Sequence, residues 1–114
     1  EARAILLGLD MVQQCTGDRF VVLSDSLSCL QSLQSRDLTH PLITEILCRV
    51  HEFVIRGFCV VFIWVPSHVG LAGNTAADAA AKAALNLPVT NLAIPYSDYN
   101  YLIRTRTLNQ WQEL

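Results

Sequence analysis

The stretch FIWVPSHVGLAGNTAADAAAKAA, residues 62–84, joins an apolar run to an alanine-rich segment through a proline and a histidine. The run starts earlier, as FCVVFIWV at residues 58–65, and is rich in residues that favour β-strands. A strand exposed on one face would alternate polar and apolar residues, so we predict a strand covered on both faces, as parallel strands are. Trp64 is expected in the core. Asn74 is expected to cap a helix that runs from Thr75 to about Leu85.

A second short apolar run, FVVLS at residues 20–24, precedes this strand in the chain. Two helical segments separate the runs. Ser26 can cap the first, and the second has Pro41 in its first turn and Gly57 at its end. A strand, a helical crossover and a second strand form a βαβ unit, which predicts a parallel pair.

Further helices are predicted at both ends of the chain. Apolar residues at the helical period predict a first helix that ends near Thr16 and Gly17; they are Ala2, Ile5, Leu6, Leu9 and Val12. Residues 88–95 are expected to be extended, and residues 97–98 to open a final helix toward Trp111. We therefore expect an α/β fold in the order helix, strand, helix, helix, parallel strand, helix, C-terminal helix.

The composition fits one globular domain, with 52% hydrophobic and 16% charged residues among 114. The formal net charge of −2 excludes a global basic field for gathering nucleic acid. A polyanion would have to be held by a few local contacts, by metal ions or by a neighbouring domain.

The cysteines and the apolar runs indicate an intracellular protein without a membrane partner. The cysteines form no C-x-x-C pair, which argues against a zinc site and is typical of a reducing compartment. The longest apolar run is too short to span a bilayer, and no charged-then-apolar leader opens the chain. We expect the protein in the cytoplasm, the nucleus or both.

Polar residues follow both predicted strands. Asp25 comes just after the first strand, His68 just after the second, and Asp78 lies one turn inside the helix that follows. The carboxyl ends of neighbouring parallel strands meet at one edge of a sheet, so these three residues should share one rim. Carboxylate oxygens suit Mg²⁺ or Mn²⁺, and paired ions of this kind serve phosphoryl displacement, with a histidine available to relay protons.

Each of these residues also has an ordinary structural explanation. An aspartate in a first helical turn favours the helix dipole, and an aspartate after a strand is often a turn former. A histidine after Pro-Ser is commonly a loop residue. Their joint occurrence in this order favours a shared site.

Several motifs resemble those of type 1 ribonuclease H domains. WVPSHVGLAGNTAADAAAKAA, residues 64–84, resembles the carboxy-terminal signature of the family. VLSDSLSCLQSL, residues 22–33, is similar to the family's strand ending in Ser-Asp-Ser with its following helix. EARAILLGL, residues 1–9, resembles the helix that carries a metal-ligating glutamate. The tail at residues 94–114 is similar to that of the domains that follow reverse transcriptase in non-LTR retrotransposons.

The resemblance implies a ribonuclease H-like fold that hydrolyses the RNA strand of RNA–DNA hybrids with two Mg²⁺ ions, or with Mn²⁺. Carried over by motif, Glu1, Asp25 and Asp78 would be metal ligands, and His68 would be a mobile histidine that aids proton transfer and product release. The implied partners are the hybrid substrate and a reverse transcriptase domain of the same polyprotein.

The chain departs from the family pattern at its start. The family's first carboxylate lies on a strand ahead of the first helix, within a three-stranded region, whereas this chain begins at Glu1. We therefore expect residues 1–87 to form a ribonuclease H-like domain that lacks its first three strands and is inactive alone. Residues 88–114 would form a C-terminal linker and helix. Ser67 and Thr75 stand where the family usually has glycine and glutamate.

Two other functions compete with this interpretation. A non-catalytic ribonuclease H-like module would have the same fold and would bind nucleic acid or support the polymerase. A nucleotide-binding α/β domain is disfavoured, because no G-x-x-x-x-G-K-[ST] loop is present.

Overall fold

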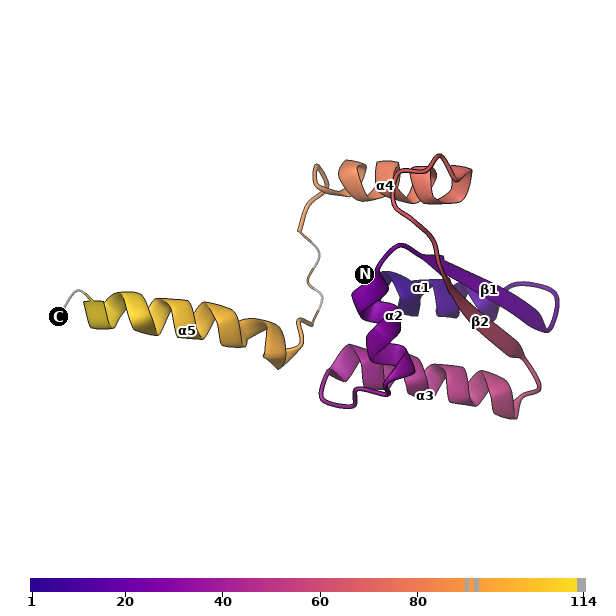
Figure 1. The fold of residues 1–114 in the computed structure, drawn as a ribbon, viewed down its shortest axis with the longest axis horizontal. Coiled ribbons are helices and arrows are strands. Elements are labelled where there is room, and N and C mark those ends of the chain that lie inside the picture. The colour runs from indigo at the N-terminus through magenta and orange to yellow at the C-terminus, as the bar shows by residue number, and fades with distance from the viewer. Residues whose placement is uncertain (90, 92, 113–114) are drawn as a thin grey trace.

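The computed structural model describes residues 1–89, 91 and 93–112 (Figure 1). The elements follow the predicted order of helix, strand, helix, helix, strand, helix and helix. Within the described residues they are α1 (Ala2–Val12), β1 (Arg19–Ser24), α2 (Leu27–Gln34), α3 (Pro41–Ile55), β2 (Cys59–Trp64), α4 (Ala72–Ala84) and α5 (Tyr96–Gln112). The fold is therefore mixed α/β.

The two strands pair in parallel, which confirms the prediction made from the βαβ pattern. Arg19 lies opposite Cys59 at one end, and Ser24 lies opposite Trp64 at the other. Helices α2 and α3 form the connection between the strands. Because the strands are parallel, both enter the loops that hold the polar residues at the same edge of the sheet.

The core lies between the first three helices and one face of the sheet. Half-buried strand residues on this face are packed against buried helical residues; they are Phe20, Val22, Val60 and Phe62. The buried helical residues are Ile5, Leu6, Leu9, Val12, Cys29, Leu33, Ile43, Ile46 and Phe53. The apolar period predicted for the first helix is thus the face that enters the core, although the helix ends at Val12, before Thr16.

The opposite face of the sheet is exposed, so the prediction of a strand covered on both faces is wrong. Val21 and Leu23 of β1 are 58% and 57% exposed, and Val61 and Ile63 of β2 are 45% and 44% exposed. The two helices that follow β2 extend away from this face, and none of their described residues is buried (Figure 1). Trp64 was also expected in the core; it alternates with Val60 and Phe62 on the inner face, but at the end of β2 it is 46% exposed.

Side-chain caps begin the two crossover helices. The Ser26 hydroxyl accepts a hydrogen bond from the Cys29 amide at 3.4 Å, as predicted. His40 caps α3, because its Nδ1 accepts from the Leu42 amide at 3.2 Å and Pro41 occupies the first turn.

The predicted cap of the next helix is wrong. Helix α4 begins at Ala72 rather than Thr75, and Leu71 is at its cap position without a side-chain hydrogen bond. Asn74 lies inside the helix, and its amide is directed to Asp25 across the chain instead. A cap would use the side-chain oxygen as an acceptor at the helix start, whereas Asn74 lies inside the helix and uses its Nδ2 as a donor to Asp25.

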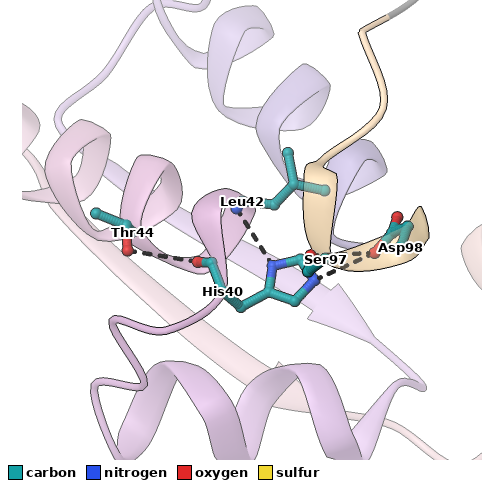
Figure 2. A network of polar contacts seen from close by, with 5 residues as sticks. All are labelled: His40, Leu42, Thr44, Ser97 and Asp98. Carbon is teal, nitrogen blue, oxygen red and sulfur yellow. Dashed lines mark hydrogen bonds and ion pairs between the residues drawn. The ribbon is translucent and has the colours of Figure 1, made fainter. Parts of the chain in front are cut away.

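The start of α5 is attached to the body by two contacts. Arg3 Nη2 donates to the carbonyl of Ala93 at 3.0 Å. Asp98 Oδ1 lies 4.0 Å from Nε2 of His40 and accepts from the Ser97 hydroxyl, as Figure 2 shows. Beyond these contacts α5 projects from the body (Figure 1).

The projecting helix makes the molecule elongated. Its longest extent is 61 Å, and its radius of gyration is 17.2 Å, against about 13 Å for a compact domain of this size. The final helix spans the region predicted for it. The predicted extended segment includes residues 90 and 92, which lie outside the described residues, and the division at residue 87 stays a prediction. Among the described residues, no helix is both long enough and apolar enough to cross a membrane.

Candidate functional site

A cleft of about 280 Å³ opens at the carboxyl end of β1. Its polar lining comes from Glu1, Ser24, Asp25 and Asn74, which belong to three separate segments of the chain. Two of the residues predicted as metal ligands, Glu1 and Asp25, therefore share one cleft.

The backbone on either side of Asp25 is held by short-range hydrogen bonds. The Ser26 amide donates to the Ser24 hydroxyl at 3.2 Å, and the Ser26 side chain caps α2. Asp25 thus sits in a tight connection between a strand and a helix, which places its carboxylate at the edge of the sheet.

Glu1 reaches the cleft from the first helix. Its carbonyl accepts from the Ile5 amide at 3.0 Å, so its backbone belongs to the first helical turn. Its carboxylate makes no capping hydrogen bond and is not used to hold the helix end. The carboxylate is therefore available to a ligand in the cleft.

Three side chains from the end of β2 and the region after it converge on Asp25. The indole Nε1 of Trp64 donates to the Asp25 carbonyl at 3.2 Å. The Ser67 hydroxyl donates to carboxylate oxygen Oδ2 at 3.1 Å, and the Asn74 amide donates to the same oxygen at 3.5 Å. These contacts link the two strand ends at the predicted rim.

These three partners were not predicted as site residues. Trp64 was interpreted as core, Ser67 as a substitution of the usual glycine, and Asn74 as a helix cap. A signal was present in the sequence, because all three donors lie within the stretch that also carries His68. Sequence alone does not show that the acceptor is Asp25, some 40 residues earlier.

His68 and Asp78 form a second pair. Nδ1 of His68 lies 3.4 Å from Oδ2 of Asp78, and the histidine side chain is 78% exposed while that of Asp78 is 34% exposed. His68 adopts a left-handed backbone conformation, with φ of +59°. Asp78 belongs to the helix that contributes Asn74 and Ala77 to the cleft, but it is not part of the cleft lining itself.

The structure thus arranges the predicted residues as two pairs. Within the described residues, no group of three or more His, Cys, Asp or Glu side chains lies close enough to hold a metal ion. The site of three carboxylates around two ions stays a prediction.

The cleft nevertheless contains side chains of the kind that Mg²⁺ prefers as ligands. Mg²⁺ keeps several waters and is often bound by one or two carboxylates together with substrate phosphates. Glu1 and Asp25 supply hard oxygen ligands of this kind, and no thiol lines the cleft. The residues present therefore fit a divalent cation such as Mg²⁺ or Mn²⁺.

A larger cavity, of about 530 Å³, is lined by the starts of α1 and α3, by α2 and by residues 93–98, and it also includes Glu1. It includes neither Asp25 nor Asp78. Cys29 lines this cavity, but burial raises the pKa of its thiol above the ordinary value, which disfavours the reactive thiolate. The polar lining of this cavity includes Glu1, His40 and Asp98, but it contains neither of the predicted site residues that follow the two strands.

Comparison with known protein families, with curated proteins and with solved structures finds no match to this chain.

Proposed function

We propose that this chain is the ribonuclease H part of a retrotransposon polyprotein and serves to hydrolyse the RNA strand of RNA–DNA hybrids. The observation that carries the proposal is the shared cleft, which both Glu1, at the N-cap of α1, and Asp25, just after the end of β1, line. The three motifs that resemble the family supply the same residues. A reverse transcriptase domain of the same polyprotein is the proposed partner.

Glu1 and Asp25 are the proposed central ligands of the divalent ions, with Asp78 as the third. When bound, the ions would supply the charge stabilisation that in-line phosphoryl displacement needs. With a formal net charge of −2, the protein has no global field to hold the hybrid, so local contacts at this edge must do so.

His68 is the proposed proton-handling residue. Its side chain is exposed, so it can reach a substrate at the edge of the cleft. Asp78 lies beside Nδ1, which favours the tautomer protonated at that nitrogen and leaves Nε2 to accept or release a proton.

The test is cleavage of an end-labelled RNA–DNA hybrid with Mg²⁺ or Mn²⁺. Because the resemblance implies a further carboxylate on a strand ahead of α1, the protein is assayed both as this chain and with its upstream coding sequence included. Asp25→Asn should lower cleavage by at least about 100-fold, because an amide is a poor ligand for a hard cation.

Asp18→Asn is the matched control, because Asp18 is an exposed aspartate at the opposite end of the same strand. It should leave cleavage unchanged. Full activity in Asp25→Asn would remove Asp25 from the site. Absence of cleavage in the extended wild-type protein would reject the enzymatic proposal.

A second candidate is a non-catalytic ribonuclease H-like module that binds hybrid or supports the polymerase. The pairing of Asp78 with His68, outside the cleft lining, favours it. This function predicts hybrid binding that Asp25→Asn does not change, without any cleavage product.

A further inference from the structure

Asp25 receives more tertiary hydrogen bonds than its neighbours at the edge of the sheet. The contacts from Ser67 and Asn74 both use carboxylate oxygen Oδ2, at 3.1 and 3.5 Å. The other oxygen, Oδ1, has no hydrogen-bond partner among the described residues. One oxygen of the carboxylate is therefore held by the protein, and the other remains for a ligand.

This asymmetry matters for cation binding. Asp25 is only half-buried, so an untethered carboxylate would rotate among several orientations and lose entropy on binding an ion. A hydrogen bond to an ionised acceptor is stronger than one between neutral groups. A hydrogen-bond donor that holds Oδ2 of Asp25 would thus reduce the entropic cost of presenting Oδ1 to a cation.

We propose that Ser67 is a positioning residue that holds Oδ2 of Asp25 and so presents Oδ1 to a divalent cation in the cleft. The inference rests on the proposed function, because it assigns the cation to Asp25. Ser67 makes the shorter of the two contacts, and it lies in the loop that also carries His68. The same hydrogen bond therefore joins the histidine loop to the end of β1.

The first test measures Mn²⁺ binding to the 114-residue chain from the electron paramagnetic resonance signal of free Mn²⁺. Ser67→Ala should weaken binding about tenfold, as expected when a partner of a metal ligand is removed. Ser67→Thr keeps the hydroxyl and should restore wild-type affinity. Ser97→Ala is the matched control, because Ser97 donates to Asp98 at 3.3 Å outside the cleft, and it should leave Mn²⁺ affinity unchanged.

If Ser67 had only a structural role, Ser67→Ala would lower the Tm without changing the affinity for Mn²⁺. The inference is overturned if Ser67→Ala binds Mn²⁺ as tightly as wild type, or if Ser67→Thr fails to restore the affinity that alanine loses.

The second test is a double-mutant cycle on urea unfolding, which reports on the hydrogen bond without any metal. Ser67→Ala should lower the folding equilibrium constant about threefold when Asp25 is present, and not at all in an Asp25→Ala background. If Ser67→Ala lowers the folding equilibrium constant equally in both backgrounds while the wild-type protein binds Mn²⁺, the positioning role of Ser67 is overturned. The cation role of Asp25 is not affected by that result. An intact coupling, in a wild-type protein that binds no Mn²⁺ even with its upstream coding sequence included, overturns the cation role of Asp25 and with it the proposed function.

Discussion

Val60→Thr should destabilise the protein, whereas Val61→Thr should have little effect. The two valines are neighbours on β2, and threonine keeps the volume and the β-branched shape while replacing a methyl group by a hydroxyl. Val60 is half-buried and packed against the core, whereas Val61 is 45% exposed on the open face of the sheet. Comparing the two variants therefore separates the effect of burial on stability from the effect of strand propensity.

The expected difference follows from where each hydroxyl is placed. A hydroxyl buried without a partner costs roughly 1–3 kcal/mol, and the partial exposure of Val60 places the expected cost near the lower end, at about 1 kcal/mol. The change at Val61 should stay within about 0.5 kcal/mol, because its hydroxyl can bind water. For a chain of this size, a loss of about 1 kcal/mol lowers the Tm by about 4 °C.

Urea unfolding followed by far-UV circular dichroism measures both variants against wild type. Val22→Thr and Val21→Thr repeat the comparison on β1, where Val22 is packed against the core and Val21 is 58% exposed. Equal losses at the inner and outer positions would show that both faces are covered in solution, and would refute the one-sided sheet. An unchanged m value is required, since it shows that the same surface unfolds in each variant.

Two further predictions concern groups whose pKa is shifted. The side-chain hydroxyl and the amide of Thr39 lower the pKa of Asp37; Thr39→Ala should raise it toward the ordinary value, as measured by carboxyl NMR titration. Because folding lowers the pKa of Asp37, its ionised carboxylate stabilises the folded protein at pH values above the pKa of the unfolded state. This stabilisation is lost as the pH falls through the pKa of the folded state. Thr39→Ala should therefore destabilise the protein at neutral pH but not below the folded pKa, and an unchanged Asp37 titration would contradict this. Burial raises the pKa of Cys29, so at pH 8 this thiol should react with a maleimide at least about tenfold more slowly than the exposed cysteines of the folded protein. In urea, where the protein is unfolded, all the cysteines should react at the same rate. Equal rates in the folded protein would refute the burial of Cys29. The exposed cysteines are Cys15, Cys48 and Cys59.

Features that depend on neighbouring residues were predictable from the sequence. The apolar period of the first helix identified the residues that enter the core, and the Ser26 cap and Pro41 marked the starts of the crossover helices. The parallel pairing followed because a helical crossover returns the chain in the same direction. The helical period and the caps rest on spacing within a few residues, and the parallel pairing rests on the general geometry of a helical crossover.

Features that depend on distant partners were not predictable in the same way. The apolar run at residues 58–65 was interpreted as a buried strand, yet a run of apolar residues does not specify which segment covers its outer face. Asn74 has the chemistry of a cap, but its amide binds Asp25. Trp64 has the size of a core residue, but its indole donates to the same aspartate at the edge of the sheet.

The sequence by itself determined the order of helices and strands, the parallel pairing of β1 with β2, and the placement of Asp25 and His68 after the two strand ends. The tertiary structure alone decided that Glu1 and Asp25 line the same cleft, that Asp78 pairs with His68, and that one face of the sheet is open. The physical reason is that local periodicity and capping act through the backbone within a few residues. Burial and side-chain hydrogen bonds, in contrast, depend on which distant segments the folded chain brings into contact.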